Sequence, residues 1–423
     1  MALLDRYEVI RRLGRGAAGD VSLARDRLAG GREVALKTIR ARVDDVLRAA
    51  FEREFLTMAS LSLPGVAQVY DFGVMRDRPG APASPFFTRA FIDGMPLDEA
   101  AESLDLDARL ALFIQVARVI APLHRAGVVH GDIKPGNAII DAQGEAWLID
   151  FGLSRMRGYE QAIESHGPVG TPPFMAREML RGEAPGVAAD IYALGATLWV
   201  LALGQYPYAS LGARAIAAKL EGKLPDIPIG CDARTRAALT VAQRALACKP
   251  LDRFPNASEL IVALERACLG QSASGSIEAT ARAFMPPRPR GHHELLQRVE
   301  HAIATRPKLS AVWHVQAPSG GGKSLFLREL KWRLQLGSHL VFEVFAGRAS
   351  GSRPLASLLD QLIIALGAEH DSSRAAAPFV INLRAGQLDP STASDVLGNL
   401  LAAVATETSV VVLVDDLDHA DTV

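Results

Sequence analysis

One short stretch of the chain constrains its chemistry more than any other. It reads HGDIKPGN at positions 130–137 and, after an apolar segment, DFG at positions 150–152. The stretch supplies two carboxylates, an amide and a lysine on two neighbouring loops. Phosphoryl transfer needs such groups, because a carboxylate must lie beside the attacking hydroxyl, hard oxygen atoms must hold Mg²⁺, and a cation must offset the developing charge. The pattern predicts Asp132 as the base, Lys134 as the cation, and Asn137 and Asp150 as the metal ligands.

These two loops resemble the catalytic and metal-binding loops of protein kinases, specifically the serine/threonine kinases of the eukaryotic (Hanks) type that bacteria also carry. Matching segments follow one another in order over residues 1–268. The resemblance implies an α+β bilobal protein kinase fold, with an N-lobe at residues 1–93 and a C-lobe at residues 94–268. It also implies that ATP and Mg²⁺ bind between the lobes.

A glycine-rich loop near the N-terminus fits this resemblance. Gly14, Gly16 and Gly19 lie between two strand-like runs, and Val21 opens the second run. Glycines allow a backbone to approach phosphates closely, because no Cβ is in the way. A dinucleotide site would have a helix after such a loop, so the strand-like run argues against that alternative. The resemblance implies that these four residues contact ATP.

The next strand-like run carries a lysine. It reads VALK at positions 34–37, and Lys37 taken alone would be a solvated strand lysine. In the kinase resemblance, Lys37 binds the α- and β-phosphates and pairs with a glutamate on the following helix. Apolar residues at helical spacing predict that helix over residues 49–63. The alignment gives the pairing role to Glu54, with Glu52 as the alternative.

The resemblance also extends to the adenine site. The resemblance assigns it Ala35 and the backbone of a hinge that runs from Ala90 to Ile92. By the alignment, Arg89 occupies the position at the back of the adenine pocket, where a charge is unusual. A slip of one residue would place Thr88 there instead, so the sequence leaves this side chain open.

Three later segments also match: GTPPFMARE at 170–178, DIYALG at 190–195 and PLDRF at 250–254. The resemblance implies that Thr171 hydrogen-bonds to Asp132 and Lys134 at the catalytic site. It implies a buried ion pair between Glu178 and Arg253. The helix that contains the second segment is expected to be buried and to anchor the catalytic loop.

One departure from the kinase pattern concerns regulation. Gly131 replaces the arginine that usually precedes the catalytic aspartate, and this arginine normally pairs with a phosphate on the activation segment. We therefore expect activity that does not require phosphorylation of this segment. Its Ser and Thr residues between Gly152 and Glu178 are Ser154, Ser165 and Thr171.

A second nucleotide-binding pattern lies further along the chain. It reads APSGGGKS at positions 317–324, between a strand-like run at 311–315 and a helical run at 325–336. This is the order of a P-loop, whose backbone N–H groups and helix N-terminus bind phosphate. A flexible glycine-rich linker is the alternative interpretation. The expected nucleotide-binding residues are Gly320, Gly322, Lys323, which reaches the β- and γ-phosphates, and Ser324, which ligates Mg²⁺.

An apolar run at 410–414 then ends in two acids. Asp415 is expected to hold Mg²⁺ through water, and Asp416 to orient the attacking water, because a P-loop requires an acid at the carboxyl end of a neighbouring strand. The surroundings resemble AAA-type signalling ATPases of the STAND group. We therefore expect a linker at 269–289 and, at 290–423, an α/β P-loop NTPase domain that is truncated at its C-terminus.

The sequence leaves two alternatives to a protein kinase. Small-molecule phosphotransferases, such as antibiotic and choline kinases, often carry HGD, but they usually lack Lys134 and the segments that begin at Gly170 and Asp190. A catalytically weak pseudokinase could instead serve as a scaffold for the ATPase module. The presence of every phosphate- and metal-handling residue argues against that alternative.

The composition of the chain limits the classes of partner and the cellular compartment that are expected. The 423 residues include 46 Lys plus Arg and 47 Asp plus Glu, so no charge excess favours a nucleic acid or a membrane surface. The 3 cysteines show no metal-binding spacing and are expected to be buried and reduced. No signal peptide or membrane span is visible, which predicts a cytoplasmic protein. The expected partners are protein substrates with Ser or Thr hydroxyls and, through the ATPase module, the chain's own further domains or a signalling partner.

Overall fold

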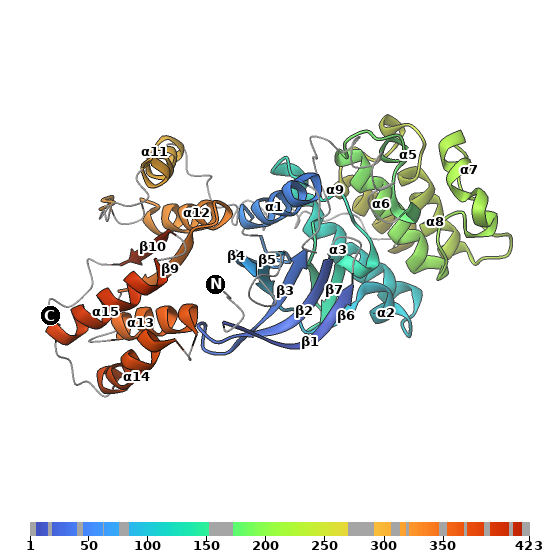
Figure 1. Cartoon of the computed structure of the whole chain (residues 1–423). Helices are drawn as coiled ribbons and strands as arrows, with labels where there is room; N and C mark the ends of the chain where they lie inside the picture. The colour runs from blue at the N-terminus through green and yellow to red at the C-terminus, as the bar shows by residue number, and fades with distance from the viewer. Residues whose placement is uncertain are drawn as a thin grey trace. The chain divides into compact units, whose positions relative to one another are not determined.

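The computed structural model of the chain is shown in Figure 1. It describes residues 6–15, 19–39, 45–61, 63–75, 84–151, 172–269, 292–305, 314–318, 321–346, 353–367, 370–384, 390–405 and 409–416. The chain forms two compact units, which are described in turn. The first comprises residues 1–43, 69–91 and 287–423, and the second comprises residues 44–68 and 92–286. Among the described helices, none is long and apolar enough to cross a membrane.

The first unit contains an antiparallel sheet in the order β1-β2-β3-β5-β4, so that β1 and β4 are its edges. Its strands are β1 (Tyr7–Arg15), β2 (Gly19–Asp26), β3 (Arg32–Ile39), β4 (Val69–Met75) and β5 (Ser84–Ala90). The two strands on either side of the glycine-rich loop confirm the expected strand, loop and strand order. Gly19 is required at its position, because a Cβ there would lie 1.7 Å from the carbonyl oxygen of Thr38 on β3.

The register of this sheet separates its two faces. Residues directly opposite in antiparallel strands point to the same face, and successive residues alternate. Val21 pairs with Lys37, and Ala35 pairs with Arg89, so these four side chains share one face, the lysine face. The opposite face carries an apolar cluster of buried residues: Tyr7, Ala24, Val34, Leu36, Met75 and Phe86.

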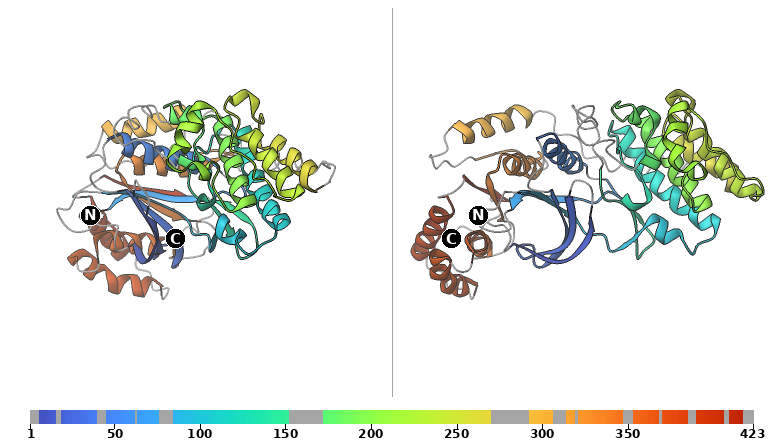
Figure 2. Two further views of the ribbon diagram at one scale, coloured as in Figure 1. Left: turned by 90° about the vertical axis from the view of Figure 1, so that its right-hand side faces the viewer. Right: turned by 45° about the vertical axis from the view of Figure 1, so that its right-hand side comes forward.

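The C-terminal part of the first unit is a three-layered α/β arrangement. Its elements are α11 (His292–Thr305), α12 (Lys323–Leu336), β9 (Leu340–Phe345), α13 (Arg353–Leu366), α14 (Asp371–Arg384), α15 (Pro390–Val404) and β10 (Val410–Asp415). Strands β9 and β10 are parallel neighbours. One apolar cluster joins them to α11 and α12, and a second joins them to α13, α14 and α15, so helices cover both faces (Figure 2).

The second unit is mainly helical. Its larger helices are α1 (Asp45–Ala59), α3 (Leu106–Arg125), α6 (Val187–Leu203), α8 (Ala233–Ala245) and α9 (Ala257–Leu264). Shorter helices are α2 (Leu97–Ala101), α5 (Arg177–Leu180) and α7 (Ala215–Glu221), and a small sheet is formed by β6 (Gly94–Pro96), β7 (Ala138–Asp141) and β8 (Ala146–Leu148). Most of α6 is buried, which confirms the expected core helix rather than a membrane span.

Several expectations about the fold are corrected. Helix α1 ends at Ala59, so Leu61 lies beyond it and is only partly buried. Three helices in a row, α13, α14 and α15, separate β9 from β10 within the region predicted to be an α/β domain. His314 and Val315 lie in no strand, and the rest of the run predicted before the P-loop is outside the described residues. Of the cysteines, only Cys268 is buried, although all 3 are free.

Candidate active site

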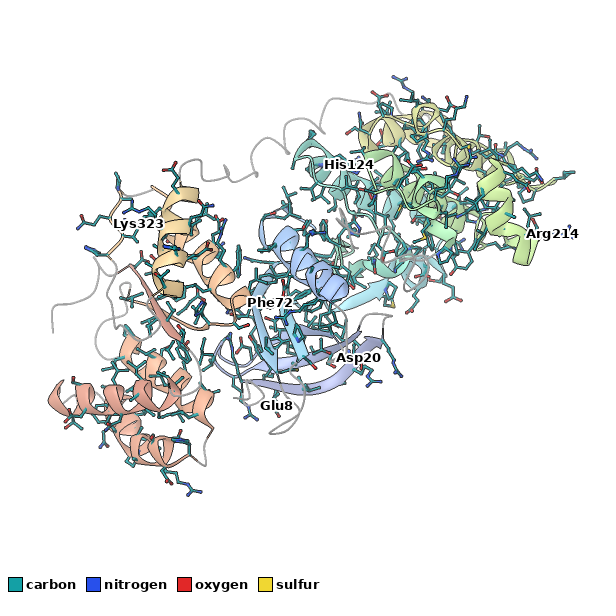
Figure 3. The ribbon with its side chains drawn as sticks, turned by 45° about the horizontal axis from the view of Figure 1, so that its top comes forward. Glu8, Asp20, Phe72, His124, Arg214 and Lys323 are labelled. Atoms are coloured by element: carbon teal, nitrogen blue, oxygen red, sulfur yellow. The ribbon has the colours of Figure 1, made fainter. Side chains whose placement is uncertain are left out.

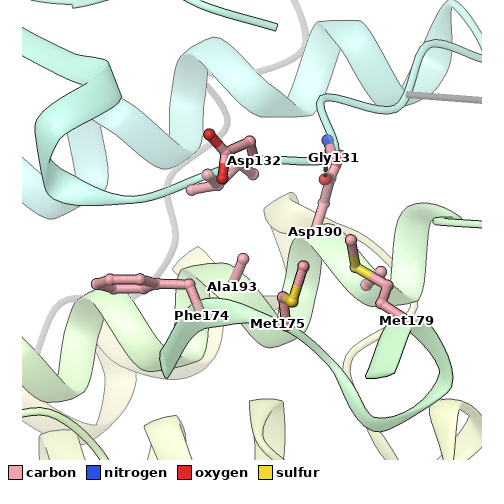
Figure 4. A pocket seen from close by; sticks show the side chains of 9 residues that line it. Gly131, Asp132, Phe174, Met175, Met179, Asp190 and Ala193 are labelled. Carbon is pink, nitrogen blue, oxygen red and sulfur yellow. Dashed lines mark hydrogen bonds between the residues drawn. The ribbon is translucent and has the colours of Figure 1, made fainter. Parts of the chain in front are cut away.

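The catalytic loop of the second unit is held by one buried carboxylate. Asp190, at the start of α6, accepts hydrogen bonds from the backbone N–H groups of His130 and Gly131, both at 2.8 Å. The ring of His124, in the last turn of α3, contacts the same carboxylate at 2.9 Å. Figure 4 shows Asp190 directly beneath Gly131. The predicted role of this helix as an anchor for the catalytic loop is therefore confirmed.

The two residues before Asp132 fix its backbone. Gly131 has a φ of +80°, a conformation that strains residues with a Cβ. The fully buried ring of His130 stacks on Phe151, with 4.6 Å between ring centroids. Burial lowers the pKa of His130, although Asp190, Asp132 and Asp150 act in the opposite direction. A neutral imidazole therefore packs beneath the loop.

Asp132 lies at the centre of the polar side chains of this loop. Its Oδ2 atom accepts from Lys134 Nζ at 2.7 Å and from Asn137 Nδ2 at 2.8 Å. Asn137 Nδ2 also donates to the Asp132 backbone oxygen at 2.8 Å. These two acceptors fix the orientation of the amide, so Asn137 Oδ1 points away from Asp132 and can serve as a hard oxygen ligand.

A hairpin brings the second candidate metal ligand to the same place. Ala138 pairs with Leu148 across β7 and β8, and the N–H of Ile149 donates to the carbonyl oxygen of Asn137 at 3.1 Å. Asn137 immediately precedes β7, and Asp150 follows the end of β8. The antiparallel pairing therefore places both residues at the same end of the hairpin. An amide oxygen and a carboxylate are oxygen donors that fit Mg²⁺ shared with phosphate.

Several of the predicted nucleotide-binding residues of the first unit lie on the lysine face of the sheet. Val21, Ala35 and Lys37 lie on it together, and Lys37 Nζ lies 5.7 Å from the centroid of the Phe87 ring. Gly14 is the second-last residue of β1, Ala90 is the last residue of β5, and Gly16 is outside the described residues.

The register also decides the question that the sequence left open at the back of the adenine site. Arg89 pairs with Ala35 on the lysine face, and it is buried. Thr88 lies on the opposite face, where its Oγ1 accepts from the N–H of Asp71 at 3.2 Å. Within the sheet, therefore, the side chain beside Ala35 is the charged one. Its guanidinium donates to the carbonyl oxygen of Ala90 at 3.3 Å.

The two candidate partners of Lys37 differ in their surroundings. Glu54 is buried, whereas Glu52 is partly exposed and forms an ion pair with Arg48 at 3.0 Å. This difference favours Glu54, as the sequence did. Since Lys37 belongs to the first unit and Glu54 to the second, their pairing stays a prediction. Ile92, predicted in the hinge, follows β5 in a segment without regular structure.

A small pocket adjoins Asp132 on the side of the segment after residue 171 (Figure 4). Its walls are mostly apolar and include Phe174, Met175 and Met179. Glu178, which precedes Met179 in the sequence, forms the predicted ion pair with Arg253 through two hydrogen bonds of 2.6 and 2.9 Å. Thr171, predicted to contact Asp132 and Lys134, is outside the described residues.

Lys219, which the sequence did not indicate, binds the backbone of the segment beside this pocket. Its ammonium is buried and donates to the carbonyl oxygens of Pro172, Pro173 and Met175 at 2.8, 2.7 and 3.2 Å. Burial lowers the pKa of Lys219 to about 7. The lysine fixes the backbone that lines the pocket. No sequence motif indicates this role of Lys219. The residue lies on the short helix α7, far in sequence from the segment whose carbonyl oxygens it binds.

The P-loop region forms the second candidate site. Gly322 adopts a left-handed conformation with a φ of +82° as the N-cap of α12, and Lys323 opens the helix. Lys323 Nζ donates to the carbonyl oxygen of Ala317 at 2.9 Å. Gly320 is outside the described residues, and Ser324 lies in the first turn. On the neighbouring strand, Asp415 is the last residue of β10, as predicted, and Asp416 follows it.

Together, these features define a phosphotransferase, and comparison with known proteins gives its family. The protein kinase domain, as a sequence family, matches residues 7–251. This chain therefore belongs to the protein kinase family. That assignment confirms the resemblance read from the HGD and DFG loops, and it accounts for the helical second unit and the five-stranded sheet.

Named relatives are bacterial serine/threonine kinases. The chain is 36% identical over 211 residues to the DNA damage-responsive serine/threonine-protein kinase RqkA of Deinococcus radiodurans, a match that covers 49% of this chain and 31% of the relative. It is 30% identical over 229 residues to a probable serine/threonine-protein kinase, PknB, of Lactococcus lactis, with 53% and 36% covered. PknD of Chlamydia muridarum matches over 355 residues at 29% identity, with 74% and 36% covered. The chain thus spans only about a third of the length of these relatives.

Proposed function

We propose that this chain is an ATP- and Mg²⁺-dependent kinase that phosphorylates serine or threonine hydroxyls of proteins. The observation that carries the proposal is the Asp132 carboxylate, which accepts from Lys134 and Asn137 and adjoins a pocket at its side. When bound, Mg-ATP supplies the phosphoryl group and the metal charge that offsets its oxygens. The named bacterial relatives support serine/threonine specificity.

Each polar residue has a distinct proposed role. Asp132 orients the acceptor hydroxyl and accepts its proton, and Lys134 offsets charge on the transferred group. Asn137 Oδ1 and the Asp150 carboxylate hold Mg²⁺. Lys37, oriented by Glu54, positions the α- and β-phosphates.

A protein substrate is favoured over a small molecule by the segment that begins at Gly170. This segment resembles the substrate-facing end of the activation segment of protein kinases, and small-molecule phosphotransferases usually lack it. Lys219 binds three backbone carbonyl oxygens of its described part, and Glu178 at its end pairs with Arg253. These contacts support a fixed backbone beside Asp132, as a peptide substrate would require.

The direct test is phosphate transfer from γ-labelled ATP. The purified chain is incubated with Mg²⁺ and either a generic protein substrate or a small-molecule acceptor such as choline or kanamycin. We expect label on protein, recovered as phosphoserine or phosphothreonine after acid hydrolysis, and its loss when the metal is chelated. Label on a small molecule, or no transfer in any arm, would contradict the proposal.

A second function is supported by the P-loop region. We infer that residues 290–423 form a nucleotide-binding module in which Lys323 and Ser324 contact the phosphates and Asp415 and Asp416 serve Mg²⁺ and water. The parallel pair β9 and β10 between two helical layers supports this, because P-loop modules place their phosphate site at the carboxyl ends of such strands. The inferred role is regulation of the kinase or of a signalling partner.

Counting bound nucleotides tests this second function. Equilibrium dialysis with a slowly hydrolysed ATP analogue should find two nucleotides per wild-type chain. Lys323→Ala should remove one of them, and Lys37→Ala should remove the other. A wild-type chain that binds a single nucleotide, lost in Lys37→Ala and retained in Lys323→Ala, would show that the P-loop does not bind one.

A further inference from the structure

Helix α12 covers the open edge of the kinase sheet. Strand β4 is the last strand of that sheet, so the outward backbone groups of β4 need partners other than a strand. Gln335 Oε1 accepts from the N–H of Phe72 at 3.1 Å, and Trp332 Nε1 donates to the carbonyl oxygen of Tyr70 at 3.3 Å. Two side chains of α12 thus take the place of a neighbouring strand at two outward-facing backbone groups of β4.

Charged groups reinforce this contact. Lys331 Nζ lies 2.8 Å from Asp71 Oδ1 and 2.6 Å from Glu343 Oε2, and Arg6 Nη2 binds the other Asp71 oxygen at 2.8 Å. Gln335 Nε2 also donates to Asp71 at 3.0 Å. Burial alone would raise the pKa of Asp71, but Arg6, Lys331 and the hydrogen bonds of Lys331 and Gln335 hold it well below its usual value. The carboxylate is therefore charged, buried and paired from both sides.

The network favours one docked arrangement. Lys331 and Gln335 are themselves buried. If α12 moved away from β4, Gln335 would lose its partners on Phe72 and Asp71, Asp71 would keep only its contacts with Arg6 and Tyr7, and Lys331 would keep only Glu343. A buried charge left without its partner is strongly destabilising, while a fully paired one is tolerated. The contact is therefore specific to this register of α12 on β4.

The same helix begins at the P-loop. Lys323 is its first residue, and Gln335 is near its last, so the two ends are about 18 Å apart at the rise of an α-helix. Figure 3 labels Lys323 at one end of α12 and Phe72 beside the other. A displacement of one end of so short a helix moves the other end with it.

Within the sheet, the contact of α12 with β4 leads to a residue that is next in sequence to one on the lysine face. The N–H of Asp71 donates to Thr88 Oγ1, and Thr88 is followed by Arg89, which shares its face with Ala35 and Lys37. A shift of β4 is therefore passed to β5 through the Asp71 to Thr88 hydrogen bond, and from there to the side chain beside the adenine position.

We propose that α12 couples the two nucleotide sites: nucleotide at Lys323 stabilises the docked α12, and docked α12 holds β4 and β5 in the arrangement that binds ATP at the kinase site. The surface on β4 is thus a regulatory docking surface, and its occupant is the chain's own helix. The coupling rests on the proposed nucleotide binding by the P-loop, whereas the docking itself rests on the contacts above. By linkage, the effect is reciprocal.

Kinase kinetics of the full chain test the coupling. The docking variant combines Lys331→Met with Gln335→Leu, and Arg328→Met removes a charge from the exposed side of the same helix as a control. We expect the docking variant to raise the KM for ATP about fivefold and the control to leave it unchanged. Lys323→Ala should raise the same KM in the wild-type background and add nothing in the docking background. Additive effects, or an unchanged KM in the docking variant, would overturn the coupling.

Two measurements keep the outcomes distinct. Hydrogen exchange at Phe72 should be faster in the docking variant than in the control, with the other strands of the sheet unchanged, which shows release of α12 rather than unfolding. In Lys37→Ala, the ATP analogue should slow exchange at Phe72, and no change there would count against the proposal. A single nucleotide bound per wild-type chain would instead refute nucleotide binding by the P-loop, and a raised KM in the docking variant would still show that α12 supports the kinase sheet.

Discussion

Asp132→Asn is expected to lower the rate of phosphate transfer by roughly a thousandfold, within the range usual for loss of a general base. The substitution keeps the shape of the side chain and one oxygen that can still accept from Lys134 and Asn137. What it removes is the negative charge and the ability to take a proton from the acceptor hydroxyl. The measurement is the initial rate of label transfer at saturating ATP.

The loss should appear in kcat rather than in ATP binding. Asp132 is proposed to act on the acceptor, and the metal ligands Asn137 and Asp150 remain, so the affinity for the ATP analogue should stay within about twofold of wild type. Asp98→Asn, the same change at an exposed position of α2, is the matched control and should leave the rate unchanged. If Asp132→Asn retained most of the activity, Asp132 would not be the base and the chain's chemistry would need another explanation.

The parts of this site that the sequence predicted are those whose polar residues lie close together in the sequence. The HGD loop carries the proposed base, cation and amide within six positions, and the structure shows a hairpin that brings Asp150 to the same end, so the short spacing correctly predicted that these residues lie close together. The pairing of Glu178 with Arg253 was predicted only through the family resemblance. No local pattern joins two such distant residues.

The parts that the sequence missed depend on register or on contacts between distant segments. Arg89 and Thr88 are adjacent, and only the pairing of β5 with β3 shows which of them lies on the lysine face. Lys219 resembles an ordinary helix lysine until its three carbonyl partners are known. Lys331 and Gln335 resemble solvated positions of the helix after a P-loop, because nothing near them in sequence indicates that β4 is their partner.

Arg253→Met is expected to cause the second large effect, a loss of roughly 3–5 kcal/mol in the free energy of unfolding of the second unit. The Arg253 side chain is fully buried. It donates to both oxygens of Glu178 and to the carbonyl oxygens of Ala188, Ala247 and Cys248. These five bonds match the five N–H donors of a guanidinium. Methionine fills a similar volume but leaves the Glu178 carboxylate without its cation.

A double variant separates the stability lost through the unpaired Glu178 charge from the stability lost with the hydrogen bonds. Glu178→Leu combined with Arg253→Met removes both charges, and it should recover part of the stability lost in Arg253→Met, because no carboxylate is then left without its cation. Recovery should be incomplete, since three backbone carbonyls still lack their donor. Urea unfolding followed by hydrogen exchange reads the second unit separately, and the sheet of the first unit is the internal control. A double variant less stable than Arg253→Met would show that the uncompensated charge of Glu178 is not the cause of the loss.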